Sequence, residues 1–182
     1  MRIISGEYRG RKLASPDFDG VRPTSDMVRE NTFNLILAHT YGAAVLDLFA
    51  GSGAMGIEAL SRGASRAVFA DIDKRCTALV RCNLDSLKLS AEVLCAPYNR
   101  ALAKLNGRRF DIIFVDPPYG RIDLTQILQC IEENNALADD GIVVYEFSEY
   151  DGLPALGNFE AVKKKRYGKT GVAVLCKKQQ VT

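Results

Sequence analysis

The stretch LDLFAGSGAMGIEAL, residues 46–60, decides the fold of this chain. An apolar run is followed by Gly51, Gly53 and Gly56, which open a predicted helix, and Asp71 lies 20 residues beyond Gly51. This spacing is typical of a strand–turn–helix unit that binds an adenosine-bearing ligand, because the glycines let the backbone approach the ligand and the acid accepts its ribose hydroxyls. The stretch alone fits a nicotinamide dinucleotide and S-adenosylmethionine equally well.

Apolar segments of strand length alternate with helical segments through most of the chain. The expected strands are Val45–Phe49, Ala67–Ala70, Glu92–Cys95, Ile112–Val115 and Ile142–Phe147, and the expected helices are Ala54–Arg62, Asp73–Leu87, Asn99–Leu105 and Leu124–Asn134. This alternation predicts an α/β fold with a mostly parallel sheet covered by helices on both faces. The last segment, FEAVKKKRYGKTGVAVLCKK (159–178), predicts an antiparallel hairpin at the sheet edge.

The first 42 residues differ from this pattern. Residues 1–21 mix short apolar and basic stretches with glycines, which predicts a small hairpin or extended arm. Residues 22–40 predict a helix capped by Thr24 or Ser25. Its expected buried side is Val28, Phe33, Leu35, Ile36 and Leu37. We therefore expect a single domain over 1–182, with an arm and helix at 1–42 and a ligand-binding core at 43–182.

The composition excludes several classes of protein. The chain has 182 residues, of which 47% are apolar and 25% charged, and no run approaches the ~18 apolar residues of a membrane helix. The first residues lack the apolar segment of a secretory signal, so a cytoplasmic location is expected. The five cysteines form no C-x-x-C pair and His39 is the only histidine, so no metal site is expected.

The charge of the chain is unevenly distributed. Residues 1–12 carry four basic groups and one acid, and residues 161–182 carry seven basic groups and no acid. Because the whole chain has a net charge of +2, the part between these ends has a net charge of −8. Two basic ends around an acidic body indicate a protein that binds a polyanion outside its catalytic centre. The alternative is that these lysines and arginines only solvate exposed strands.

Asp47 favours S-adenosylmethionine over a dinucleotide as the ligand of the glycine loop. Its carboxylate lies inside an expected strand, where a buried acid is costly unless it has a partner. Beside a pyrophosphate this acid would repel the ligand. Beside the cationic amino-acid end of S-adenosylmethionine it would attract the ligand.

The sequence FDIIFVDPPYG, residues 110–120, contains a second candidate site. Two prolines end the expected strand at the same edge as the glycine loop. Asp116 and the Pro117 carbonyl can accept both N–H groups of an aromatic amine, and Asp116 can stabilise the positive charge that develops when the amine attacks a methyl group. Tyr119 can stack on an unstacked base. Nicotinamide chemistry has no use for this arrangement, which further favours methyl transfer.

Five segments in this order resemble the bacterial 16S rRNA (guanine-N2)-methyltransferases of the RsmD type. They are MRIISGEYRGRKL, RPTSDMVRENTFN, LDLFAGSGAMGIEALSRGA, FVDPPY and VVYEF. The resemblance implies a seven-stranded class I methyltransferase fold and a cytoplasmic enzyme. It further implies methyl transfer to the exocyclic N2 of one guanine in 16S rRNA, within the small ribosomal subunit or its assembly intermediate. We expect the enzyme to be a monomer.

The resemblance also assigns roles to individual residues. Asp47, Gly51, Ser52 and Gly53 line the methyl-donor pocket and Asp71 holds the ribose, while Asp116, Pro117, Pro118 and Tyr119 hold the flipped guanine. The implied RNA contacts are Arg9, Arg11, Lys12, Arg22 and Arg29, to which the charge distribution adds Lys163, Lys164 and Lys165. For Arg22 and Arg29 the alternative role is to brace the first helix.

Two departures from the family pattern stand out. Met27 replaces a residue that is usually basic, and the segment VLCAPYNRAL (93–102) lacks the acid or amide that often meets the adenine amino group. Backbone groups near Ala96 or Tyr98 are the expected substitutes.

Three alternative functions remain open. The first is an N6-adenine methyltransferase acting on DNA or another RNA. The second is a noncatalytic RNA-binding assembly factor, and the third is a nicotinamide-dependent oxidoreductase.

Overall fold

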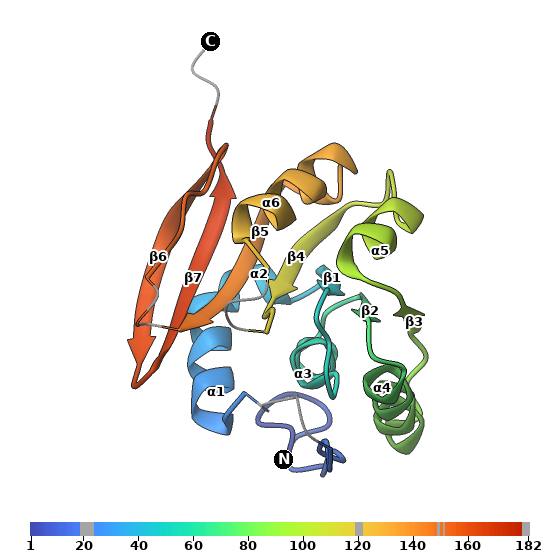
Figure 1. Ribbon diagram of the computed structural model, residues 1–182. Coiled ribbons are helices and arrows are strands. Elements are labelled where there is room, and N and C mark those ends of the chain that lie inside the picture. Colours follow the sequence, from blue (N-terminus) through green and yellow to red (C-terminus); the bar gives the residue numbers. More distant parts are fainter. Residues whose placement is uncertain (19–23, 119–121, 149, 151, 180–182) are drawn as a thin grey trace.

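A computed structural model describes residues 1–18, 24–118, 122–148, 150 and 152–179. Over these residues the chain forms a seven-stranded sheet in the order β3-β2-β1-β4-β5-β7-β6 (Figure 1). The strands are β1 Ala44–Asp47, β2 Arg66–Asp71, β3 Glu92–Cys95, β4 Phe110–Val115, β5 Leu137–Ser148, β6 Phe159–Tyr167 and β7 Thr170–Lys177. Strands β1 to β5 are parallel, whereas β7 is antiparallel to β5 and β6. The predicted α/β fold and its C-terminal edge hairpin are confirmed.

Helices cover both faces of the sheet (Figure 1). One face carries α1 Asp26–Leu35, α2 Leu37–Thr40, α3 Ala54–Ser61 and α4 Lys74–Leu87, and the other carries α5 Tyr98–Lys104 and α6 Leu124–Glu133. Each face has its own apolar cluster, because the doubly buried strands send alternate side chains to opposite sides. No helix among the described residues is long and apolar enough to cross a membrane.

The strand order reverses between β1 and β4, which makes this place the expected ligand crevice. From β1 the chain continues outward to β2 and β3, while β4 starts the other half of the sheet. In such open sheets, ligands bind outside the carboxyl ends of the strands where the order reverses. The glycine loop follows β1 and Asp116 follows β4, so the two candidate motifs flank this crevice.

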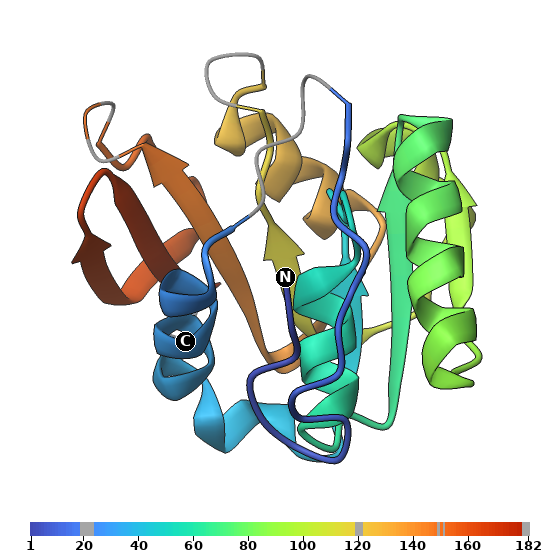
Figure 2. The same ribbon diagram turned by 90° about the horizontal axis from the view of Figure 1, so that it is seen from below.

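The N-terminal ribbon, residues 1–14, packs against α3 and α4 rather than extending into solvent (Figure 2). Its two halves pair through the antiparallel bridge between Arg2 and Lys12, as the hairpin prediction expected. The carboxylate of Glu58, buried in α3, accepts the backbone N–H groups of Ile4 (2.8 Å) and Ser5 (3.0 Å). The ribbon is therefore fixed to the helix that begins at the glycine loop.

The predicted helix over 22–40 is divided in two. The hydroxyl of Ser25 caps α1 by accepting the N–H of Val28, and the helix ends at Ile36 before the short α2 begins. This break turns the second helix, so Leu37 is 67% exposed, and its predicted burial is wrong. Val28, Phe33 and Ile36 are buried as expected.

Candidate active site

The glycine loop turns tightly between β1 and α3. Gly51 and Gly53 adopt positive φ angles of 54° and 79°, which side chains disfavour, and Gly53 precedes the first residue of α3. A Cβ atom on Gly53 would lie 3.2 Å from the side chain of Val80 in α4. The glycines therefore permit both the turn and the close approach of α4.

Gly56 joins α3 to the sheet. A Cβ atom at this position would lie 2.3 Å from the ring of Phe69 in β2, so only glycine allows the helix to pack this closely. Its backbone N–H donates to Oδ2 of Asp47 at 2.9 Å. The carboxylate of Asp47 thereby holds the first turn of α3 beneath the glycine loop.

Asp47 is a buried acid with an unusual protonation equilibrium. The residue is 3% exposed. Burial raises the pKa of Asp47 to about 7, against the effect of the Gly56 N–H, and the charge of Asp71 raises it further. A cation bound close to this carboxylate would favour its ionised form. Asp47 thus fits the predicted role beside the cationic end of a donor.

Asp71 ends β2 and also supports the glycine loop. Its Oδ2 accepts the N–H of Gly51 and its Oδ1 accepts the N–H of Asp73, each at 2.9 Å. Since a carboxylate has about four acceptor positions, the same group can accept ribose hydroxyls as well. The next residue, Ile72, is 72% exposed at this edge and offers an apolar surface to a flat ring. The sequence reasoning missed Ile72, although a bulky apolar residue directly after the acid was a readable signal.

Asn83 links the glycine loop to the N-terminal ribbon. This residue of α4 is 1% exposed, and its amide donates to the carbonyl of Ser52 at 2.9 Å. The same side chain exchanges two hydrogen bonds with the backbone of Ala14. Sequence reasoning also missed this contact, because an asparagine on a helix carries no signal of a partner 31 residues away.

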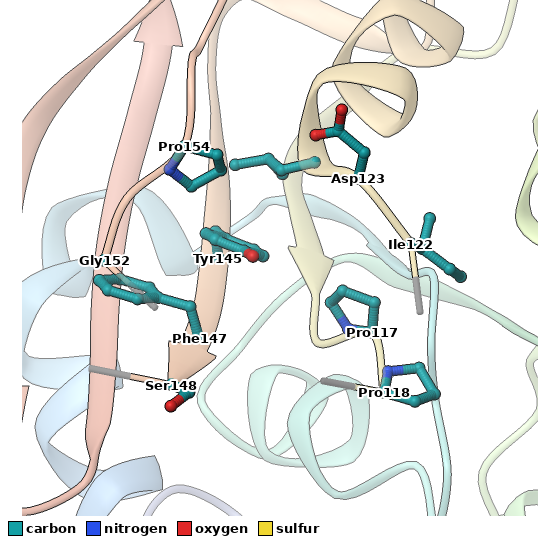
Figure 3. Close-up of a pocket in the computed structure, with 10 residues that line it drawn as sticks. Pro117, Pro118, Ile122, Asp123, Tyr145, Phe147, Ser148, Gly152 and Pro154 are labelled. Atoms are coloured by element: carbon teal, nitrogen blue, oxygen red, sulfur yellow. The ribbon is translucent and has the colours of Figure 1, made fainter. Parts of the chain in front are cut away.

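Asp116, Pro117 and Pro118 follow β4 on the other side of the crevice. Pro117 and Pro118 line a cavity of about 180 Å³, and Tyr145 and Phe147 of β5 line its opposite wall (Figure 3). The two rings lie parallel, with centroids 5.4 Å apart. Tyr119 and Arg22, the two remaining predicted residues of this region, lie outside the described residues.

One of the backbone groups expected to recognise the adenine ring already has a hydrogen-bond partner. The backbone N–H of Ala96 already donates to the carbonyl of Asp71 at 2.9 Å, where it extends the pairing of β2 and β3. Tyr98 begins α5, and its ring lies 5.9 Å from that of Phe49, which follows β1. Of the two places named from sequence, the start of α5 is therefore the better candidate.

The prediction that Arg29 contacts RNA is wrong. The side chain is fully buried, where it donates to the carbonyl of Arg2 and to Asp26, and its Nε lies 3.8 Å from Glu58. Burial lowers the pKa of Arg29, while Glu58 and Asp26 act in the opposite direction. Arg29 braces α1 against the ribbon, which is the alternative role considered from sequence.

The other basic residues lie on different surfaces. Arg9, Arg11 and Lys12 are exposed on the ribbon, where Arg11 also donates to the carbonyl of Ser86. The three lysines of β6 are exposed but do not share one face, because neighbouring residues of a strand point to opposite sides. Lys163 donates to the carbonyl of Leu35 at the end of α1 (2.6 Å), whereas the ammonium of Lys164 lies 5.3 Å from the ring centroid of Phe147.

Cysteine chemistry and metal binding each require particular side chains in particular surroundings. Cys76 is buried, and burial raises its pKa to about 12, which keeps the thiol protonated. Within the ranges that the structure describes, His, Cys, Asp and Glu side chains form no group of three suited to a metal ion.

The acid beneath the loop is expected to make binding of the predicted donor depend on pH. A bound cation lowers the pKa of a neighbouring carboxylate, so below about pH 7 binding must release the proton of Asp47. The affinity for S-adenosylmethionine, measured by calorimetry between pH 5.5 and 7.5, is expected to rise with pH and to level off near pH 7. Asp47→Asn should weaken binding and remove this dependence. The same pH dependence in both proteins would contradict the role of Asp47.

Asp47 also affects stability. Its pKa is higher in the folded chain than the ~3.9 of an unfolded aspartate, so its ionisation destabilises the fold as the pH rises from about 4 to 7. Asp47→Asn keeps an oxygen that can accept the Gly56 N–H but has no charge to bury. The ligand-free variant should therefore be at least as stable as the unchanged protein at pH 8.

Comparison with known proteins identifies relatives over most of the chain. The family model described as conserved hypothetical protein 95 matches residues 1–176. Ribosomal RNA small subunit methyltransferase D of Escherichia coli K12 is 41% identical over 157 residues, which cover 86% of this chain and 79% of that protein. The protein of the same name from Haemophilus influenzae is 36% identical over 172 residues, covering 92% and 89% of the two chains.

A solved structure agrees with these relatives. The Escherichia coli protein yhhF, provisionally described as a methyltransferase, superposes with a TM-score of 0.88 at 36% identity. The match covers 99% of each chain. The similarity therefore includes the N-terminal ribbon, the glycine loop, the segment after β4 and the C-terminal hairpin.

Proposed function

This chain belongs to the family of conserved hypothetical protein 95 and ribosomal RNA small subunit methyltransferase D, and from this premise we propose that it methylates the exocyclic N2 of a guanine in 16S rRNA. The observation that carries the proposal is that two motifs lie at the carboxyl ends of adjacent strands. The glycine loop follows β1 and Asp71 ends β2, while Asp116 and Pro117 follow the adjacent β4. One motif suits an adenosine-bearing donor and the other suits an aromatic amine.

The donor in this proposal is S-adenosylmethionine. It supplies an electrophilic methyl group on a sulfonium, and it leaves as the neutral thioether S-adenosylhomocysteine. Gly51, Ser52 and Gly53 hold its amino-acid end close to Asp47, and Asp71 accepts the ribose hydroxyls. The fit rests on the narrow loop that a side chain on Gly53 would crowd, and on the buried acid below it.

The acceptor amine is held at the end of β4. The carboxylate of Asp116 and the carbonyl of Pro117 accept its two N–H groups, which favours a tetrahedral nitrogen with an available lone pair. This pair forms the new N–C bond while the C–S bond breaks and its electrons remain on sulfur. Asp116 stabilises the positive charge on the methylated nitrogen, which then passes one proton to solvent water. Holding the two reactants in line provides the rest of the acceleration.

The small ribosomal subunit, or an assembly intermediate of it, is the proposed partner. The relatives from Escherichia coli and Haemophilus influenzae carry ribosomal RNA of the small subunit in their names. The exposed basic residues of the ribbon and of β6 provide the positive charge that a phosphate backbone requires. We accordingly place the enzyme in the cytoplasm and expect it to act as a monomer.

Transfer of labelled methyl groups tests the proposal. Radiolabelled S-adenosylmethionine is supplied with small subunits from cells that lack this protein, with naked 16S rRNA, and with duplex DNA. The labelled nucleoside is identified by digestion and mass spectrometry. We expect N2-methylguanosine in the subunit sample.

The other outcomes separate the alternatives. N6-methyladenosine in DNA or RNA would keep the chemistry but replace the acceptor. Tight donor binding without transfer to any sample would favour the noncatalytic RNA-binding factor. Binding of NADH in place of S-adenosylmethionine would favour the oxidoreductase.

Neutralising the lysines of β6 should weaken RNA binding. Replacing Lys163, Lys164 and Lys165 by alanine is expected to reduce the slope of log affinity against log salt by roughly 0.7–0.9 for each phosphate that the variant no longer neutralises. The measurement is binding to small subunits between 50 and 200 mM salt. Lys104→Ala, at the far end of α5, is the matched control. An unchanged slope in the triple variant would show that these lysines only solvate the strand.

A further inference from the structure

In the sequence of β5, Glu146 stands between Tyr145 and Phe147, the two residues whose rings line the cavity. Tyr145 and Phe147 face the α6 side of the sheet (Figure 3), and both belong to the apolar cluster of that face. Because side chains alternate along a strand, Glu146 faces the opposite side, on which α1 lies. Its partner across the antiparallel ladder, Val172, belongs to the cluster of that second face.

The register of the sheet brings Glu146 next to Asp116. Val115 and Tyr145 are direct partners in the parallel pair of β4 and β5. Asp116 is the first residue after β4, and Glu146 is the next residue of β5. Because neighbouring strands lie about 4.8 Å apart, continuing the register by one step places the two residues next to each other on the same face. The register thus puts a second acid beside the proposed acceptor of the substrate amine.

Thr24 fixes one oxygen of Glu146. Its hydroxyl donates to Oε2 at 3.4 Å, and both residues are half-buried. The segment before α1 thus orients this carboxylate. Since a carboxylate offers about four acceptor positions, Glu146 can accept from Thr24 and from a bound base at the same time.

We propose that Glu146 selects guanine by accepting its N1–H while Asp116 holds the neighbouring N2 amine. This inference rests on the proposed function and extends it to the choice of base. On the Watson–Crick edge of guanine, N1 carries a proton beside the amine, so two adjacent donors meet two adjacent carboxylates. The N1 of adenine carries a lone pair beside its amine, and a carboxylate at this place repels it. A site built to accept an N–H discriminates strongly against an analogue that lacks it.

The test compares variants of two residues. Glu146→Gln retains an oxygen that can accept from Thr24 but has lost the charge and gained an N–H donor. It is expected to lower kcat/KM on small subunits by about 10- to 100-fold, the value of a hydrogen bond to a charged group, while the Kd of S-adenosylmethionine changes less than twofold. Glu30→Gln makes the same change at an exposed glutamate of α1 and is the matched control. It is expected to keep activity within about threefold.

A base analogue provides a readout that a structural role would not change. Small subunits are reconstituted with rRNA that carries 2-aminopurine at the methylated position. This base keeps the amine at C2 but presents a lone pair at N1. The unchanged protein should strongly prefer guanine over 2-aminopurine, and Glu146→Gln should reduce this preference at least tenfold, because its amide can donate to N1.

Three results would overturn the inference. Full activity of Glu146→Gln on guanine, or an unchanged preference between the two bases, would show that Glu146 does not contact N1. The same loss in Glu30→Gln would show that the effect comes from removing one negative charge and not from the position of Glu146. If the unchanged protein forms no N2-methylguanosine at all, the proposed function fails first, which distinguishes the two failures.

Discussion

Asp116→Ala is expected to reduce methyl transfer at least about 100-fold while the affinity for S-adenosylmethionine stays within about twofold. The reason is that Asp116, which follows β4, is the proposed contact of the acceptor amine, whereas the proposed donor contacts lie at the ends of β1 and β2. Losing one group that stabilises developing charge costs a factor of this order. Single-turnover transfer to small subunits and calorimetric donor binding measure the two quantities separately.

A second variant separates charge from hydrogen bonding at this position. Asp116→Asn keeps one acceptor oxygen, so it should retain more activity than the alanine variant and less than the unchanged protein. Undiminished transfer in Asp116→Ala would remove Asp116 from the chemistry. A parallel loss of donor binding would instead place its role in the fold or in the donor site.

Arg29→Met is expected to destabilise the protein by about 2–3 kcal/mol without changing the salt dependence of RNA binding. Removing one partner of a buried ion pair costs about 3–5 kcal/mol. The expected loss is smaller here because Glu58 keeps its ion pair with Arg62, whose Nε lies 2.8 Å from the carboxylate. In addition, Nε and Nη1 of Arg29 have no hydrogen-bond partner among the described residues, so their burial already costs free energy. For a chain of this length the melting temperature should fall by roughly 5–10 °C.

Arg9→Ala is the control for this experiment. Arg9 is exposed on the ribbon, so its loss should leave the free energy of unfolding within about 0.5 kcal/mol. It should lower the salt slope of RNA binding if it contacts a phosphate. An Arg29→Met protein of unchanged stability and weakened RNA binding would restore the sequence-based role of Arg29.

The parallel half of the fold could be predicted from sequence because its signals are local. Glu92–Cys95 has the predicted bounds, and the helix expected at Asp73–Leu87 begins one residue later because Asp73 is its cap. β5 was predicted to start at Ile142 but begins at Leu137. The acids at 139 and 140 resemble a turn. They lie in the irregular stretch between the pairs Phe110–Leu137 and Ile112–Ile142 of β4 and β5, which no local pattern reveals.

The candidate site could be predicted only in part for a related reason. The glycine loop, Asp71 and Asp116 carry signals in spacing and residue type, and the structure places them at one edge. Arg29 had the signal of a surface cation, but its buried partner Glu58 lies in another helix. The roles of Asn83 and Glu146 depend on hydrogen bonds between segments that are distant in sequence. Asn83 bonds to Ser52, and Glu146 bonds to Thr24.

The attachment of the N-terminal ribbon has a consequence for how the protein is made. The ribbon is synthesised before its hydrogen-bond partners, Glu58, Asn83 and Ser86, which lie between 53 and 75 residues later in the chain. At roughly 5–20 residues per second, synthesis needs about 3–15 s to provide them. During that interval the basic ribbon has none of these partners. It can therefore take its place on α3 and α4 only after those two helices have been made.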